Sequence, residues 1–194
     1  MLAHTDAAGF VLVGGRSSRM GADKASLTYL GMPLACYVAA QIAPVVDRVS
    51  LVGNPMVHGD LGLPVVPDEH PGAGPVSAII SALRSTTAAW NIVTACDLPH
   101  VRPEIFQSML HRIQTYNVQC VVPLTPDGRE QVLCAVYRRD ALHGLETAFA
   151  AGEVRLRTAV RQLQTEYWLV ESSAWSVNVN TPEEWAIHTA EREV

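Results

Sequence analysis

Short apolar runs alternate with stretches of helical spacing along the chain, and this alternation constrains the fold more than any other sequence feature. Apolar runs predict strands within 9–15, 47–54, 63–69, 89–99 and 118–124. Apolar residues at helical spacing predict helices within 32–46, 74–85 and 102–116. Strands that alternate with helices of about 10 to 15 residues are typical of a mostly parallel sheet with helices on both faces.

The regular alternation of predicted strands and helices ends after Pro126. The sequence predicts a turn and a strand within 127–140, then helices at 142–150 and 155–164. Short strands are predicted within 166–171 and 175–180, and a closing helix begins near 181. No repeat, low-complexity segment or linker interrupts the 194 residues, so we expect a single α/β domain with three α/β/α layers and a Rossmann-like sheet.

Charge and composition exclude several classes of protein. The net charge of −5 argues against a protein that coats nucleic acid by charge. No apolar run approaches the ~20 residues of a membrane span, and the N-terminus lacks the pattern of a signal peptide. The four cysteines lie far apart without a zinc-binding pattern, so we interpret them as small core residues in a reducing compartment. A cytoplasmic protein is expected.

The stretch LVGGRSSRMGADK, residues 12–24, leaves the carboxyl end of the first predicted strand. Ligands bind at that edge in open parallel sheets. The stretch fits neither the Rossmann glycine pattern nor the P-loop, but its glycines let backbone N–H groups approach phosphate oxygens. Arg16, Arg19 and Lys24 can neutralise phosphate charges. A triphosphate fits these residues better than a neutral ligand; an ordinary turn with solvated cations is the alternative.

Asp97 ends the apolar run NIVTACDLP. A carboxylate at the carboxyl tip of a buried strand is badly placed for a core and well placed for a site. Mg²⁺ prefers one or two protein carboxylates together with phosphate oxygens and water. We therefore predict Asp97 as a Mg²⁺ ligand, with a helix cap or turn before Pro99 as the alternative.

The chain resembles the nucleotidyltransferase family that contains the molybdenum cofactor guanylyltransferases, the MobA proteins. LVGGRSSRMGADK is similar to the family signature, with Val13 in place of the usual Ala. VVPDEHPGAGPVSAI, TACDLPHV, DGREQVLCAVYRRD and SVNVNTPEEW resemble four further motifs in the same order. Val132 stands where the family usually has Pro. Each motif is weak by itself, and the set of five is specific.

The resemblance implies that the terminal phosphate of molybdopterin attacks the α-phosphorus of GTP, with Mg²⁺ as cofactor and pyrophosphate as leaving group. It implies a nucleotidyltransferase fold with a nucleotide-binding half, residues 1–125, and an acceptor-binding half, residues 126–194. We expect no nucleic-acid or membrane partner, and transient contact with proteins that deliver molybdopterin or receive the product is left open. The catalytic candidates are Arg19, Lys24 and Asp97.

The resemblance also places residues around each substrate. The candidates for GTP binding are Leu12, Val13, Gly14, Gly15, Lys24, Asn54, Asp68 and Asp97. The Asp68 carboxylate could accept from guanine N1–H and the exocyclic amine together, which cytosine cannot present. Turn formation is the alternative for Asp68 and Asn54. Asn178, Asn180 and Gln131 are the acceptor-binding candidates, and polar strand ends are the alternative for the asparagines. Arg129 could also face the acceptor, and solvated helix positions are favoured for Arg155 and Arg157.

Three other interpretations stay open on the sequence. A cytidylyltransferase would keep the fold and change the base, although Asp23 and Asp68 argue against it. A non-enzymatic nucleotide binder would be expected to have lost Lys24 or Asp97, and both are present. A flavodoxin-like carrier would need aromatic residues in the loops of the site, and those loops lack them.

Overall fold

One seven-stranded sheet forms the centre of the molecule, in the order β5-β4-β1-β6-β8-β7-β9. The computed structural model describes residues 6–14 and 23–179. The strands of this sheet are β1 (Ala7–Leu12), β4 (Arg48–Gly53), β5 (Val65–Pro67), β6 (Trp90–Ala95), β7 (Cys120–Leu124), β8 (Cys134–Arg138) and β9 (Thr165–Leu169). Five of them fall within segments that the sequence predicts as strand, while β1 begins two residues before its predicted segment and β9 begins one residue before.

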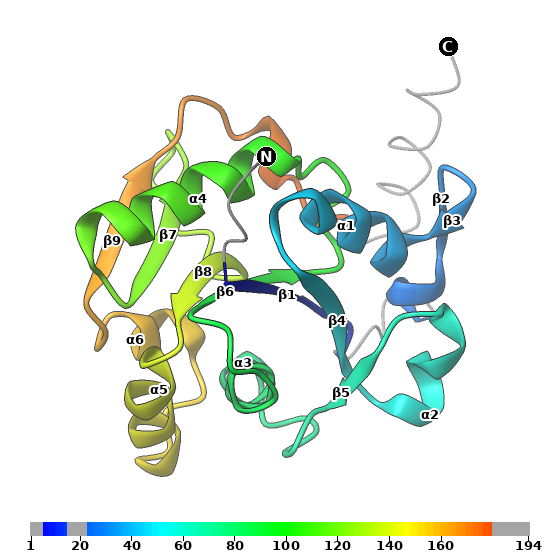
Figure 1. Cartoon of the computed structure of the whole chain (residues 1–194), viewed down its shortest axis with the longest axis horizontal. Coiled ribbons are helices and arrows are strands. Elements are labelled where there is room, and N and C mark those ends of the chain that lie inside the picture. Colours follow the sequence, from blue (N-terminus) through cyan, green and yellow to red (C-terminus); the bar gives the residue numbers. More distant parts are fainter. Residues whose placement is uncertain (1–5, 15–22, 180–194) are drawn as a thin grey trace.

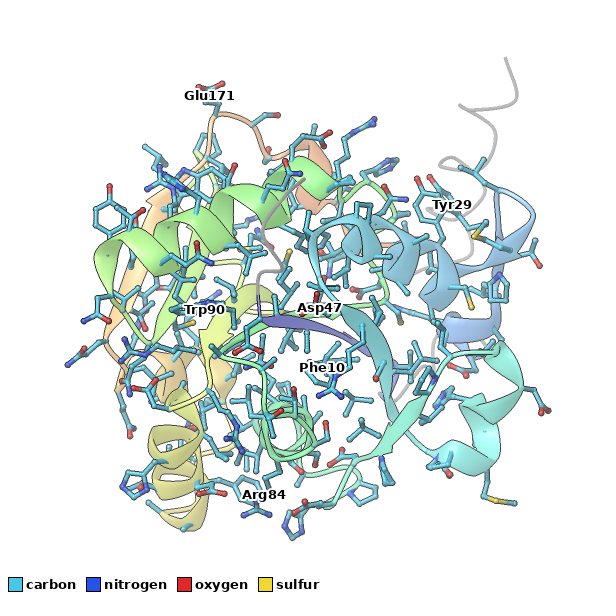
Figure 2. All side chains as sticks on the ribbon, in the orientation of Figure 1. Phe10, Tyr29, Asp47, Arg84, Trp90 and Glu171 are labelled. Atoms are coloured by element: carbon cyan, nitrogen blue, oxygen red, sulfur yellow. The ribbon has the colours of Figure 1, made fainter. Side chains whose placement is uncertain are left out.

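Helices cover both faces of the sheet (Figure 1). α1 (Leu34–Ile42) and α4 (Pro103–Tyr116) lie on one face; α3 (Pro75–Arg84), α5 (Ala141–Ala150) and α6 (Leu156–Val160) lie on the other. Side chains alternate along each strand, so Val11 packs in the core under α1 and α4. Phe10 packs with the core on the opposite face, and Figure 2 shows it between β1 and α3.

The direction of the strands decides where a site can form. β5, β4, β1 and β6 are parallel neighbours, and β7 and β9 form a second parallel pair. Among the strands of this sheet, β8 is the one that runs antiparallel to its neighbours, β6 and β7. The carboxyl ends of the six other strands therefore meet at one edge, where β8 begins. The sheet is mostly parallel, as the sequence predicts.

Several short elements were not predicted from the sequence, and the strand pair at 28–33 takes the place of the start of the helix predicted within 32–46. β2 (Thr28–Tyr29) and β3 (Met32–Pro33) form a separate hairpin, and its turn places Leu30 and Gly31 at positive φ of 48° and 81°. α2 (Pro55–His58) follows β4, and the 3₁₀ helix η1 (Lys24–Ser26) precedes the hairpin. The remaining 3₁₀ turns are η2 (Ala43–Val45), η3 (Gly59–Leu61) and η4 (Ala174–Ser176).

The strand predicted within 175–180 is wrong for the residues that the structure describes. Trp175 lies in η4, and residues 177–179 belong to no strand. Trp175 and Val179 are buried, while Val177 and Asn178 are both exposed, so burial does not follow the alternation in the sequence. Instead of joining the sheet, the segment crosses its carboxyl edge, where the Val179 N–H donates to the Asp97 carbonyl at 3.1 Å.

Two further predictions concern helices. α6 ends at Val160, four residues before the predicted end at 164. The closing helix predicted after residue 180 lies outside the described residues. Among the helices of residues 6–14 and 23–179, none combines the length and the apolar composition needed to cross a membrane.

Candidate active site

The carboxyl edge of the sheet brings together most of the predicted site residues. Leu12 ends β1, Asn54 follows β4, Asp68 follows β5, and Asp97 follows β6. The segments that follow β7 and β9 bring Gln131 and Asn178 to the same edge. Gly15, Arg19 and Asn180, together with Arg16, lie outside the described residues.

Asp97 is the point where three distant segments converge. Its Oδ2 lies 3.9 Å from the Lys24 Nζ and accepts a hydrogen bond from the Asn178 Nδ2 at 3.3 Å. Burial raises the pKa of the Asp97 carboxyl, and Lys24 and the Asn178 hydrogen bond act in the opposite direction. Of the two alternatives, the helix cap does not apply to α4, because Arg102 is its N-cap residue, whereas Asp97 does lie in a turn.

The free oxygen of this carboxylate fits a divalent cation. Asp97 Oδ1 is buried and makes no hydrogen bond to any residue that the structure describes. Within the described part of the chain, no three His, Cys, Asp or Glu side chains are grouped to hold a metal by themselves. A single carboxylate suffices for Mg²⁺ when phosphate oxygens and water complete its shell, so Asp97 fits that role.

The two described ends of the signature loop are held by different contacts. The Val13 N–H donates to the Val52 carbonyl at 3.0 Å, and the Cys96 N–H donates to the Leu12 carbonyl at 3.2 Å. Gly14 is exposed beyond them. At the other end, Asp23 caps η1 by accepting from the Ala25 N–H at 3.2 Å, which fixes Lys24 as the first residue of that turn.

Val13, where the chain departs from the family signature, packs against Gly53. A Cβ at position 53 would lie 2.7 Å from the Val13 Cγ2 and 2.9 Å from the His58 Nδ1. The extra bulk of Val13 is therefore accommodated against a residue without a side chain. Val132, the second departure, is half-buried and packs against the core under α3 and α5.

Asn54 and Asp68 both make the local contacts that the alternative interpretation predicts. Asn54 Oδ1 caps α2 by accepting from the Met56 N–H at 2.9 Å. Asp68 Oδ1 accepts from the His70 N–H at 3.1 Å and from the Ser77 hydroxyl at 2.7 Å. Both bonds use the same oxygen of Asp68, and no residue in the described part of the chain donates to Oδ2. That oxygen keeps its capacity to accept from a ligand.

A polar hollow of about 520 Å³ lies beside Asp97 on the side of the predicted acceptor. Its lining is Thr125, Asp127, Arg129, Glu130, Gln131, Arg157, Ser173, Ser176, Val177 and Asn178. Arg157 contributes to this lining and is exposed, as favoured from the sequence, and its Nε lies 3.0 Å from the Glu130 Oε2. Arg155 pairs with Glu153 and is exposed, as expected.

Several side chains at the site were missed from the sequence. Ser77 and Ser81, four residues apart, interrupt the apolar face of α3, and this spacing was a usable signal. His58 lies within α2, four residues after Asn54, and no sequence pattern predicts that its imidazole is buried. Glu130 binds both Arg157 and Arg161, and only the fold brings these three residues together.

Comparison with known proteins identifies the family. The model of the MobA-like NTP transferase domain matches residues 9–167. A probable molybdenum cofactor guanylyltransferase from Chloroflexus aggregans is 33% identical, covering 95% of this chain and 94% of the relative. A molybdenum cofactor guanylyltransferase from Cereibacter sphaeroides is 34% identical, covering 92% of this chain and 93% of the relative.

Solved structures share the fold. Molybdopterin-guanine dinucleotide biosynthesis protein A from Archaeoglobus fulgidus aligns with a TM-score of 0.80 at 23% identity, over 96% of this chain and 98% of that chain. A cytidylyltransferase from Thermus thermophilus, acting on 2-C-methyl-D-erythritol 4-phosphate by its name, aligns with a TM-score of 0.72 at 17% identity, over 95% and 98%. The chain belongs to the family of MobA-like NTP transferases.

Proposed function

We propose that this chain is a molybdenum cofactor guanylyltransferase, which transfers GMP from GTP to the phosphate of molybdopterin and releases pyrophosphate. The observation that carries the proposal is the convergence of three of the five motifs: Lys24 and Asn178 each lie within 4 Å of the Asp97 Oδ2, and Asn178 lines a polar hollow. The curated relatives with that name, each covered over most of its length, support the choice of reaction.

The arrangement suits a reaction between two anions. Nucleophile and electrophile are both phosphates, so the protein must bring them together and neutralise the charge that develops on the leaving pyrophosphate. Lys24 supplies a positive charge next to Asp97. Asp97 would hold Mg²⁺ through its uncompensated Oδ1. When bound, the cation supplies further neutralisation of phosphate charge and fixes the orientation of the α-phosphate.

In this proposal, the two ends of the carboxyl edge of the sheet bind different substrates. Asp68 Oδ2 accepts from guanine N1–H and the exocyclic amine, while Oδ1 stays bound to Ser77. The hollow lined by Gln131, Asn178 and Arg157 receives molybdopterin, whose phosphate carries the attacking oxygen. The four cysteines are free thiols, which suits a reducing compartment, and we assign the reaction to the cytoplasm.

Calorimetric titration with GTP, CTP and ATP, each with and without Mg²⁺, tests this proposal. We expect GTP to bind with the lowest Kd and the affinity to rise when Mg²⁺ is added. A preference for CTP would overturn the assignment of the base and keep the site. Failure of all three nucleotides to bind would overturn the site itself.

A further inference from the structure

His58 is a buried imidazole that contacts two segments of the site at once. It is 5% exposed at the end of α2. Its Nδ1 accepts a hydrogen bond from the Asn54 N–H at 3.2 Å, and its Nε2 lies 3.0 Å from the Asp23 Oδ2. Asn54 follows β4 and Asp23 closes the signature loop, so the ring connects segments separated by about thirty residues in sequence.

The hydrogen bond from Asn54 fixes which ring nitrogen carries the proton in the neutral imidazole. Because Nδ1 accepts, the proton sits on Nε2, which faces Asp23. Asp23 Oδ2 is buried and makes no well-directed hydrogen bond to any described residue. The Nε2–H, 3.0 Å away, therefore faces an oxygen that no other described group satisfies.

The ring has little freedom to move. A Cβ on Gly53 would lie 2.9 Å from Nδ1 and 3.1 Å from Cε1, so the imidazole packs directly on the backbone of residue 53. α2 begins at Pro55 and is capped by Asn54, which anchors the helix that carries the ring. The ring presents Nε2 to Asp23 from a fixed position.

The contacts of Asp23 also restrict the position of Lys24. One Asp23 oxygen faces His58 and the other accepts from the Ala25 N–H at 3.2 Å. The carboxylate is thereby held from both sides, and the turn of η1 that starts at Lys24 is held with it. The Lys24 Nζ then lies 3.9 Å from the Asp97 Oδ2.

We propose that His58 is a positioning residue that holds the Asp23–Lys24 turn in place, so that the Lys24 ammonium meets the triphosphate. The proposal rests on nucleotidyl transfer as the function of the site, and it does not depend on which base is bound. His58 touches no reacting atom and acts through Asp23.

Two substitutions separate the two contacts of the ring. In His58→Gln the amide nitrogen can take the place of Nε2 and donate to Asp23. In His58→Asn the amide oxygen can take the place of Nδ1 and accept from Asn54, but the side chain is too short to reach Asp23. Each is made with Lys24 present and in a Lys24→Ala background. His143→Asn, on the exposed face of α5, is the matched control.

The assay follows pyrophosphate release with molybdopterin as acceptor and whichever of GTP, CTP and ATP the wild type uses best as donor, and thermal unfolding monitors the fold. We expect His58→Asn to lower kcat/KM at least about tenfold. His58→Gln should stay within about threefold of the wild type. In the Lys24→Ala background His58→Asn should cause no further loss, because its effect passes through Lys24. His143→Asn should match the wild type.

If His58→Asn lowered kcat/KM by the same factor with Lys24 present and in the Lys24→Ala background, the proposal would be overturned. His58 would then act only by supporting the fold. Wild-type activity in His58→Asn would also overturn the proposal. A nucleotide preference other than GTP would contradict the proposed substrate and leave this test intact. If no nucleotide is used by the wild type, titration of Mg²⁺–pyrophosphate replaces turnover, and an unchanged Kd in His58→Asn would overturn the positioning role.

Discussion

The buried carboxylate of Asp97 suits a binding site but is unfavourable for the stability of the fold. That carboxylate is largely buried, and one oxygen has no hydrogen-bond partner in the described part of the chain. Burial disfavours the charged form, and the raised pKa shows that Lys24 and Asn178 compensate for this only in part. A residue kept in such a position is typical of a functional site.

Asp97→Asn should therefore lower activity and leave stability intact. The pKa of this carboxyl is higher in the folded than in the unfolded chain, so the folded state binds the proton more tightly. Stability then falls as the pH rises from the ordinary Asp pKa through the raised value, and the cost persists at pH 7. We expect turnover to fall at least about tenfold, or ~1.4 kcal/mol of transition-state stabilisation.

Urea unfolding of the ligand-free protein at pH 7 checks the stability of Asp97→Asn, with Asp60→Asn on the exposed turn η3 as control. The midpoint of Asp97→Asn should equal or exceed that of the wild type. A clearly lower midpoint would show that the charged Asp97 stabilises the fold, and would remove the physical argument for its role.

Lys24 is the only lysine in the sequence, which gives a direct probe of the signature loop. We expect acetic anhydride to modify Lys24 and the N-terminal amine in the free protein. GTP with Mg²⁺ should slow modification of Lys24 at least about tenfold and leave the N-terminal amine unaffected, because phosphate oxygens would cover the ammonium. Peptide mass spectrometry measures both rates. Equal slowing of both amines, or of neither, would argue against contact between Lys24 and the triphosphate.

At the scale of elements, α3 holds the loop that carries Asp68. Ser77 donates to the Asp68 carboxylate at 2.7 Å, and Ser81 accepts from the Glu69 N–H at 3.0 Å. Arg84, further along the same helix and labelled in Figure 2, pairs with Glu69 and Glu146. One helix thus fixes the loop after β5 through several turns.

Ser77→Ala should weaken discrimination between bases more than it weakens the fold. Without the hydroxyl, the Asp68 carboxylate loses the bond that orients it toward guanine. We expect the preference for GTP over ITP, which lacks the exocyclic amine, to fall about threefold to tenfold. Competition of the two nucleotides in one assay measures this ratio. Ser85→Ala, at the end of α3, should leave the ratio unchanged; an unchanged ratio in Ser77→Ala would contradict the role assigned to Ser77.

Elements could be predicted from the sequence where local pattern decides them. The run NIVTACDLP predicts β6 and the place of Asp97, because the first charged residue comes just after the end of the buried strand. The alternation SVNVN predicts a strand and is wrong for 177–179, because this segment crosses the edge of the sheet as a loop, with Val179 buried and Val177 exposed. α2 is a single turn, too short to give a helical period.

At the scale of the whole molecule, the order of the strands makes the hollow. β8 lies between β6 and β7, so the turn at 125–131 that precedes it and the loop after β9 meet next to Asp97. The pairing of β8 with β6 and with β7 does not follow from the sequence, because packing between residues far apart in the sequence decides which strands are neighbours. For the same reason, the contacts of Glu130 with Arg157 and Arg161 could not be predicted.

The core that supports this arrangement contains three of the four cysteines, whereas the sequence predicts that all four are core residues. Burial raises the pKa of the Cys96 and Cys134 thiols to about 12, and burial also raises that of Cys120. Cys36 is half-buried. We expect iodoacetamide at pH 8 to alkylate Cys36 at least about tenfold faster than the other three in the native protein. In urea all four should react alike. Rapid native labelling of Cys134 would contradict the packing of β8.

Transfer of label from GTP to molybdopterin tests the central claim most directly. The purified protein is incubated with Mg²⁺, molybdopterin and GTP labelled at the α-phosphate, and the products are separated. The account predicts a labelled molybdopterin–guanine dinucleotide from GTP labelled at the α-phosphate. GTP labelled at the γ-phosphate should give an unlabelled dinucleotide, because that phosphate leaves with pyrophosphate. Labelled CTP that is incorporated in place of GTP, or label from GTP that never reaches molybdopterin, would contradict it.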